Sequence, residues 1–272
     1  MLVHSFLIEK GYNVAYVGIY GSQNYWLDIY TEEYESDYDF KAVIVPSLKD
    51  LVNNSKPIST TIEYEWGQID LKDIRVFTET LCKCNPAYIE TLYTPYSIYT
   101  DDYKKIIDER KNLVSEMGVF LLKASYGMIK EKEKAFSHPY PSIKDKIDKW
   151  GYDPKQLHHI VRLNHLMSYF IESEQYIIDI PNVYRLNLLD IKTGKINLEE
   201  AIPMRDNFVW QSKKIIDEYK VEPTFEAKER IIQYSKDLIY NKIKMEEEEY
   251  LSECCGAELD NDRCRDCKEM CG

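Results

Sequence analysis

The sequence predicts an α+β protein in three parts. Residues 1–105 alternate short, β-rich apolar runs with helical segments, which predicts a mixed β-sheet core covered by helices. Residues 106–250 carry apolar side chains at helical spacing and predict a helical domain. Five of the seven cysteines fall within residues 251–272, which predicts a small metal-binding tail.

The first part is read from its turn residues and periodicity. Apolar runs predict strands at 13–20 and 39–45, and the alternating segment 60–71 predicts one strand with a wet face. Helices are expected at 2–11, at 47–54 and at 76–83, the last ending before Asn85-Pro86. These strands and helices together predict the helix-covered sheet of residues 1–105.

The second part reads as consecutive helices. Apolar periodicity predicts helices at 101–114, 116–136, 153–173, 205–220 and 225–250. Asp153-Pro154 is a good cap and first-turn pair for the third of these. Two prolines mark residues 135–152 as a loop.

Composition narrows the protein class. Hydrophobic residues make up 44% and charged residues 30%, which is ordinary for a globular protein. No apolar run approaches the roughly 20 residues that span a bilayer, and the N-terminus lacks a basic start and apolar core. We therefore expect a cytoplasmic protein without a membrane partner. The net charge of -12 disfavours non-specific binding of nucleic acid through a general basic field.

The segment GIYGSQNYWLDIYTEEYESDYDFKAVIVPS carries the chemistry. Asp37 and Asp39 are two residues apart at the start of a predicted strand, so their carboxylates project to one face. Such a pair repels, and a hard divalent cation, Mg²⁺ or Mn²⁺, relieves the repulsion. Gly21 and Ser22, between a strand and a helix start, suit a phosphate cradle.

A third carboxylate on a neighbouring strand would complete a two-ion site. Asp70 is the first candidate and Asp73 the second, and both also suit solvated strand ends. The alternative for the whole segment is a hairpin with a polar loop.

This arrangement resembles the core of the DNA polymerase beta superfamily of nucleotidyltransferases. More narrowly, it resembles nucleotidyltransferases encoded by tailed bacteriophages and related to the RNA-repair-associated polymerase-beta-like family (RlaP). The residues concerned are GSQNYWLD…ESDYDFKAVIVPS, CNPAYIETLYTPY and GYDPKQLHHIVRL. The resemblance implies that Gly21 and Ser22 hold triphosphate oxygens, and that Asp37, Asp39 and Asp70 hold two metal ions. It also implies the host cytoplasm as the location.

Two features depart from that family. Its members usually have glycine where Trp26 stands, and the link from Ser22 to Asp37 is longer here. We interpret the Trp26 ring as a plug in the lengthened loop, with stacking on a base as the alternative. A plug predicts that Trp26→Gly lowers stability before it lowers nucleotide affinity.

A cationic helix is the second element of the site. Lys155, His159 and Arg162 lie at i, i+4 and i+7, on one helical face. A lysine and an arginine there would suit a triphosphate or acceptor phosphates. The alternative is a solvated basic face with a buried histidine. His158 breaks the spacing and is the weaker candidate of the adjacent histidines.

Two further motifs have bland alternatives. For Asn85 and Glu90, in the motif NPAYIE, we expect a structural role, with a substrate contact as the alternative. In the tail, four of five cysteines are expected to bind structural Zn²⁺: Cys254, Cys255, Cys264, Cys267 and Cys271. Acidic residues outnumber basic ones there, which favours a protein partner over nucleic acid.

The sequence thus predicts a nucleotidyltransferase that moves an NMP from an NTP to a hydroxyl acceptor and releases pyrophosphate. By resemblance, the first candidate acceptor is RNA, either a tRNA or an RNA 3′ end. A protein or small-molecule acceptor is the alternative within this class. A catalytically silent module that binds NTP or RNA is the alternative from another class.

Overall fold

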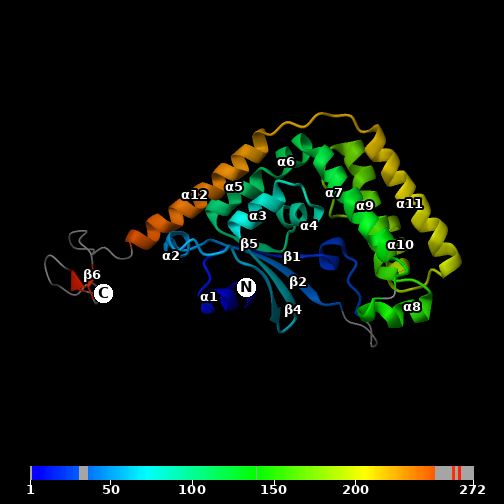
Figure 1. Ribbon diagram of the computed structural model, residues 1–272, viewed down its shortest axis with the longest axis horizontal. Helices are drawn as coiled ribbons and strands as arrows, with labels where there is room; N and C mark the ends of the chain where they lie inside the picture. The colour runs from blue at the N-terminus through cyan, green and yellow to red at the C-terminus, as the bar shows by residue number, and fades with distance from the viewer. Residues whose placement is uncertain (1, 31–35, 139, 249–258, 261–262, 265–272) are drawn as a thin grey trace.

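A five-stranded sheet carries the first part of the chain (Figure 1). The computed structural model describes residues 2–30, 36–138, 140–248, 259–260 and 263–264. The strands are β1 (Val14–Tyr20), β2 (Tyr38–Ile44), β3 (Ser59–Tyr64), β4 (Gly67–Asp73) and β5 (Ser97–Tyr99), in the order β3-β4-β2-β1-β5. Only β2 and β4 pair in parallel, so the sheet is mixed, as predicted.

The expected single strand at 60–71 is wrong, because it is the hairpin β3–β4. The turn lies at Glu65-Trp66, and Gly67 follows with φ 151°. A Cβ at Gly67 would lie 1.9 Å from the Tyr38 carbonyl oxygen, so the close approach of β2 requires glycine. The alternating pattern runs through this turn without a break, and it therefore concealed the hairpin.

The two faces of the sheet have different covers. Helix α1 (Leu2–Glu9) packs on one face, against Phe40, Ala42, Ile69 and Leu71. The other face holds Tyr16 and Val43 beneath α3 (Ile74–Leu81), α4 (Pro86–Ile89) and α5 (Asp101–Asp108). Figure 1 shows α1 and these helices on opposite sides of the strands. The short helix α2 (Leu48–Val52) begins at Ser47, as predicted, with a capping box to Asp50.

The described chain between residues 110 and 248 is helical, and two of its helices, α8 (Lys144–Trp150) and α10 (Asn182–Lys192), are not predicted. The others are α6 (Arg110–Glu116), α7 (Gly118–Ala135), α9 (Pro154–Ser173), α11 (Leu198–Glu218) and α12 (Glu226–Glu248). The loop expected at 135–152 is only partly right, because α8 forms in it after the prolines. Neither α10 nor β5 is foreseen by the sequence patterns.

One hydrophobic cluster crosses the boundary expected near residue 105. It runs from Tyr16 and Val43 in the sheet to Leu121, Met167 and Leu238 in the helices. Helix α12 packs on α5 and α3, and Figure 1 shows it running diagonally across the helices that cover the sheet. The sheet and the helices are therefore joined by a continuous core. Within the described ranges, no helix has the length and hydropathy needed to cross a membrane.

Candidate active site

The buried carboxylate of Glu90 holds the Gly21-Ser22 turn in place. Gly21 has φ 87° and precedes the 3₁₀ helix η1 (Ser22–Tyr25). Its backbone N–H donates to Glu90 Oε1 at 2.6 Å. Gly21 also lies beside the next element of the site, since a Cβ there would come 3.4 Å from Asp39 Oδ2. The positive φ is what favours glycine at this position, and the distance to Asp39 shows that the turn lies beside that carboxylate.

Glu90 is the centre of a hydrogen-bond network that fixes η1. Its side chain is 2% exposed and accepts from Asn24 Nδ2 at 2.8 Å and from the Tyr25 hydroxyl at 3.0 Å, besides Gly21. The Thr94 hydroxyl donates to Asn24 Oδ1 at 2.7 Å. The Tyr25 and Tyr176 hydroxyls lie 3.1 Å apart. Glu90 is therefore placed to position the turn, and it lies below the surface that a substrate would reach.

The neighbouring Asn85 is structural. Its side chain accepts from Ala87 N at 3.0 Å and caps α4, with Pro86 in the first turn. This short helix ends at Ile89, directly before Glu90, and so positions the Glu90 side chain against η1. The motif NPAYIE is thus a support for the turn.

Asp37 and Asp39 lie at the edge of the sheet nearest the turn. Asp39 pairs with Tyr20 across β1 and β2, and Gln23 of η1 donates to the Asp37 carbonyl oxygen at 2.6 Å. Asp37 is exposed and Asp39 is half-buried. Burial raises the pKa of Asp39, and the charge of Asp37 raises it further. The two carboxylates and the Gly21-Ser22 turn are thus brought together, as the sequence predicts.

Two lysines from the helical part face this edge. Lys155, in the first turn of α9, opposes the rise in the pKa of Asp39, and Lys192, at the end of α10, acts in the same direction more weakly. Lys192 also donates to the Leu27 carbonyl oxygen at 2.6 Å, just after η1. Burial, with Lys155 nearby, lowers the pKa of Lys192 to about 8. Sequence reasoning missed Lys192, since it lies on a helix that was not predicted.

Asp70 shares the face of Asp39 but is engaged by lysines. Lys41 Nζ lies 2.6 Å from its Oδ2, and Lys72 Nζ lies 2.8 Å from its Oδ1. Although burial opposes them, these two ammonium groups hold the pKa of Asp70 below its ordinary value. A low pKa makes a carboxylate a weak general base. The structure thus brings Asp70 to the site without leaving its oxygens open.

Asp73, the other candidate, is remote from this edge. It pairs with Ile44 at the far end of β2, is 2% exposed, and caps α3. Its carboxylate accepts from Arg75 Nε at 2.9 Å and from Arg75 Nη2 at 2.7 Å. Asp73 therefore serves the fold at the opposite end of the strands.

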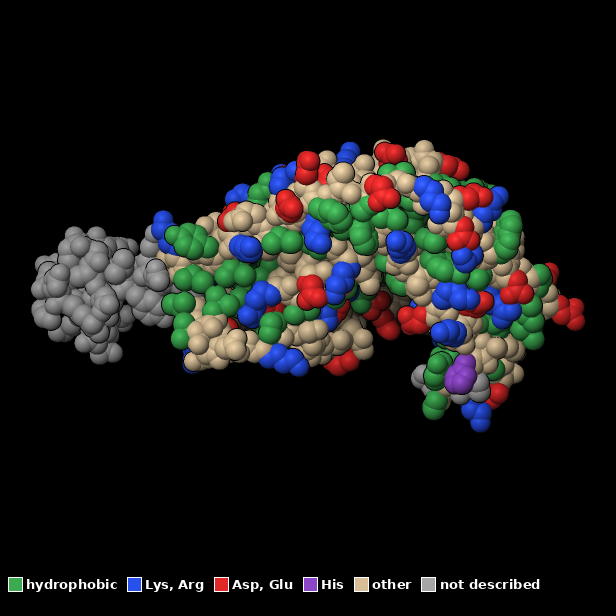
Figure 2. All heavy atoms as spheres, turned by 45° about the horizontal axis from the view of Figure 1, so that its top comes forward, with side chains coloured by type: hydrophobic (Ala, Val, Ile, Leu, Met, Phe, Trp, Pro, Cys, Tyr) green, Lys and Arg blue, Asp and Glu red, His purple; other side chains and the backbone are tan. Residues whose placement is uncertain are grey.

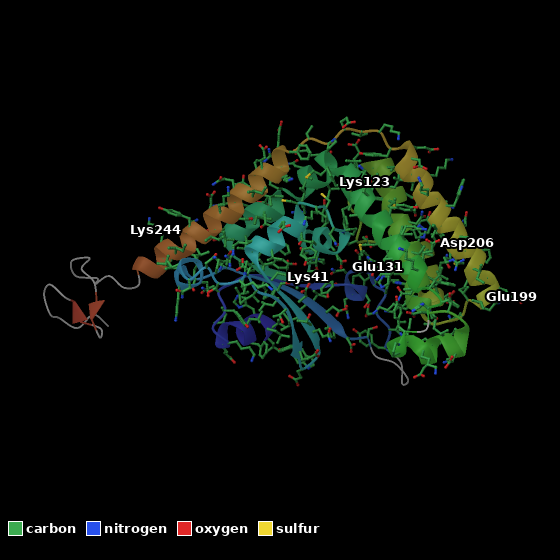
Figure 3. All side chains as sticks on the ribbon, viewed as in Figure 1. Lys41, Lys123, Glu131, Glu199, Asp206 and Lys244 are labelled. Atoms are coloured by element: carbon green, nitrogen blue, oxygen red, sulfur yellow. The ribbon has the colours of Figure 1, made fainter. Side chains whose placement is uncertain are left out.

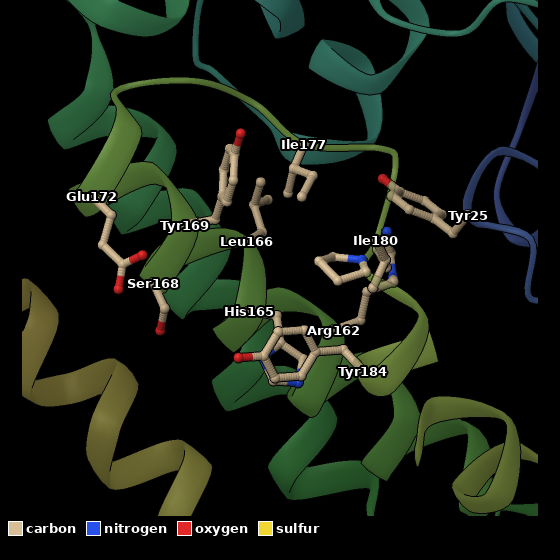
Figure 4. A pocket seen from close by; sticks show the side chains of 11 residues that line it. Tyr25, Arg162, His165, Leu166, Ser168, Tyr169, Glu172, Ile177, Ile180 and Tyr184 are labelled. Atoms are coloured by element: carbon tan, nitrogen blue, oxygen red, sulfur yellow. The ribbon is translucent and has the colours of Figure 1, made fainter. Parts of the chain in front are cut away.

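Arg162 meets η1 and not the carboxylate pair. Its guanidinium lies 4.3 Å from the centre of the Tyr25 ring. Burial lowers its pKa, but Tyr25 and Glu90 overcome this effect and hold the pKa above the ordinary range. Figure 4 shows Arg162 and Tyr25 at one end of a cavity of about 100 Å³ between α9 and residues 177–184, with Glu172 at the other end. Arg162 thus joins α9 to the turn.

The adjacent histidines are placed as neutral groups. Burial lowers the pKa of His158 and of His159 well below the ordinary value, and neighbouring cations lower both further. His158 is 5% exposed, and its Nε2 has no hydrogen-bond partner in the part of the chain that the structure describes. A neutral imidazole is a poor ligand for phosphate. Of the three predicted phosphate-binding residues Lys155, His159 and Arg162, Lys155 is the one whose positive charge acts on Asp39.

Trp26 does not fill a cavity. It ends η1 with φ 56°, in the left-handed region, and its side chain is 54% exposed. The plug interpretation is therefore wrong, because a plug would be buried. The positive φ gives a backbone reason why glycine suits this position.

The cysteine tail lies largely outside the described residues. Leu259–Asp260 (β6) pairs with Arg263–Cys264 (β7) in a two-stranded hairpin, which places Cys264 on a strand. Cys254, Cys255, Cys267 and Cys271 fall outside the described ranges, so the zinc site stays a prediction.

The donor set decides which metals the site suits. Asp37 and Asp39 supply carboxylate oxygens at a surface edge, which suits one hard divalent cation. Across the described ranges, no group of three His, Cys, Asp or Glu side chains is arranged to hold a metal ion. Asp37 and Asp39 therefore stay the candidate ligands, while both oxygens of Asp70 are paired with lysines.

Comparisons with known proteins add little. No protein-family profile matches the chain, and no curated protein is similar to it in sequence. Among solved structures, it is similar to a nucleotidyltransferase-like protein from Exiguobacterium sibiricum 255-15, with 12% identity over 90% of this chain and 88% of the other. The TM-score is 0.30. A functional assignment must therefore come from the side chains of this chain.

Proposed function

We propose that the chain is a metal-dependent nucleotidyltransferase that moves an NMP from an NTP to a hydroxyl acceptor. The observation that carries this proposal is the placement of a glycine-serine turn against a carboxylate pair, with two lysines opposite. Phosphates need both positive charge and close backbone approach, and the carboxylates need a cation between them and the phosphates. The arrangement therefore suits a triphosphate bound through a divalent ion.

The residues divide the work. Asp37 and Asp39 would hold Mg²⁺ or Mn²⁺, which supplies charge neutralisation at the phosphates. The Ser22 hydroxyl would donate to triphosphate oxygens, Gly21 would hold the turn in place through its N–H bond to Glu90, and Lys155 would bind the phosphates as a point charge. The acceptor oxygen displaces pyrophosphate from the α-phosphorus, and its proton passes to solvent. Catalysis of this kind is mostly positioning and electrostatics.

RNA is the acceptor that we propose first. The resemblance in sequence is what supports this acceptor. Figure 2 shows basic and acidic side chains interspersed over the visible face. Because the net charge of -12 disfavours a broad basic field, an RNA bound here would be held near its reacting end.

The test is a transfer assay with each α-labelled NTP, Mg²⁺ and total cellular RNA. We expect label on RNA, and no label with the Asp39→Asn variant. Label on protein instead of RNA would show that the acceptor is a protein. Tight NTP binding without transfer to any acceptor would show a silent binding module and overturn the enzyme proposal.

A further inference from the structure

A buried lysine contacts Asp70, the carboxylate expected as the third metal ligand. Lys41 is 4% exposed and is the second residue after Asp39 on β2, so both side chains project to the same face. A buried ammonium is costly unless it is paired. The contacts of Lys41 therefore show what this part of the sheet is built to hold.

The contacts of Lys41 surround its ammonium. Nζ lies 2.6 Å from Asp70 Oδ2, 4.2 Å from the centre of the Tyr20 ring and 4.7 Å from that of Tyr88. Aromatic faces attract such a cation. Figure 3 labels Lys41 between the strands and the helices above them. Lys72 occupies the second oxygen of Asp70 at 2.8 Å.

The strand register makes this arrangement a property of the fold. In the parallel pair of β2 and β4, Lys41 stands opposite Asp70. The residue opposite Asp39 is Gln68, which is neutral and donates to Glu63 Oε1 at 3.0 Å. The position that would place a carboxylate directly beside Asp39 thus holds an amide, and Asp70, two residues further along β4, faces a lysine.

We infer that this site holds one divalent ion, on Asp37 and Asp39, and that the Lys41 ammonium takes the place of a second ion. Asp70 is then a positioning residue for Lys41 and not a metal ligand. The reason is electrostatic: Asp39 and Asp70 share one face, and Lys41 neutralises their repulsion without a metal. This inference rests on the proposed function only in assuming that the site binds metal with NTP.

Counting bound Mn²⁺ tests the inference. Wild-type protein is titrated with Mn²⁺ beside a non-hydrolysable NTP analogue, and electron paramagnetic resonance gives the number of bound ions and their coupling. We expect one ion per chain, without the exchange coupling of a close ion pair. Two coupled ions, or none, would overturn the inference.

Three variants locate the ion, each checked for folding by circular dichroism. Asp70→Asn is expected to keep one ion, whereas Asp39→Asn is expected to bind none. A loss of the ion in Asp70→Asn would make Asp70 a ligand and contradict the inference. Lys41→Met removes the ammonium at similar volume and frees Asp70 Oδ2, so the count should rise to two. A count that stays at one would refute the claim that Lys41 replaces an ion.

The count also separates this inference from the proposed function. Ion binding is measured without turnover, so one ion in a protein that transfers no label would leave the inference standing and remove the enzyme proposal. Two ions in an active enzyme would do the reverse. Where Lys41→Met fails to fold, the wild-type count and the Asp70→Asn variant decide alone.

Discussion

Glu90→Gln is the substitution that most directly probes how the Gly21 turn is held. Glutamine keeps the shape of the side chain but offers one acceptor oxygen in place of two. Glu90 Oε1 accepts from Gly21 N and Asn24 Nδ2, and Oε2 accepts from the Tyr25 hydroxyl. Whichever way the amide turns, its NH₂ group faces a former donor.

The magnitude follows from these three bonds. A hydrogen bond to a charged group contributes about 1.5–3 kcal/mol, and a neutral one about 0.5–1.5 kcal/mol. Three bonds that each lose about 1 kcal/mol give a loss of about 3 kcal/mol in the free energy of unfolding. At this chain length, that corresponds to a fall in Tm of about 6–12 °C.

Thermal unfolding followed by circular dichroism measures this loss. The matched control is Glu79→Gln, because Glu79 pairs only with Lys83 and its side chain is 69% exposed. We expect the control to keep the wild-type Tm. A Glu90→Gln protein with the Tm of the control would refute the network as the support of the turn. NTP affinity should fall with Glu90→Gln as well, since the turn loses its fixed position.

The remaining predictions concern the rim of the site and the tail. Trp26→Gly should change the free energy of unfolding by less than about 1 kcal/mol, because two effects oppose each other: strain at the positive φ is relieved, while the unfolded chain gains conformational freedom. A loss of about 3 kcal/mol, measured by urea unfolding, would show that the Trp26 ring is packed as a plug after all. Lys155→Met should weaken NTP binding about tenfold with an unchanged Tm, whereas Arg162→Met should lower the Tm; equal effects on both readouts would contradict the separate roles. Lys192 has a pKa of about 8 in the folded protein against 10.5 ordinarily, so the folded state binds fewer protons between these values and its stability rises with pH there. Subtracting the urea stability curve of Lys192→Met from that of the wild type should isolate this rise, and a flat difference from pH 8 to 10.5 would disprove it. Protein purified without chelator should carry one zinc per chain, and Cys264→Ser should lose it; metal analysis showing zinc near zero in the wild type would refute the predicted zinc site of the tail.

Local patterns predicted many of the elements and the carboxylate pair, while tertiary contacts set the surroundings of each side chain. The placement of Asp37 and Asp39 beside the Gly21 turn follows from spacing on a strand and turn chemistry, which are local properties. Arg162 shares a helical face with Lys155, but seven residues advance a helix by about 10 Å, so it reaches Tyr25 and not Asp39. No local sequence signal shows whether the partner of Arg162 is Asp39 or Tyr25.

The engagement of Asp70 shows the other limit. A carboxylate on a neighbouring strand reads as a ligand from its position alone, but its partner depends on register. The pairing of Lys41 with Asp70 follows from how β2 and β4 align, which two separate sequence segments do not state. The same holds for Lys192, which reaches the site from a helix of weak pattern.

The fate of the α-phosphate tests the central claim most directly. Wild-type protein is incubated with Mg²⁺, total RNA and NTP labelled at either the α- or the γ-phosphate, beside Asp39→Asn. The account predicts α-label in RNA, γ-label only in pyrophosphate in equal amount, and neither product with the variant. Transfer of γ-label to the acceptor, or α-label transfer that survives Asp39→Asn, would contradict it.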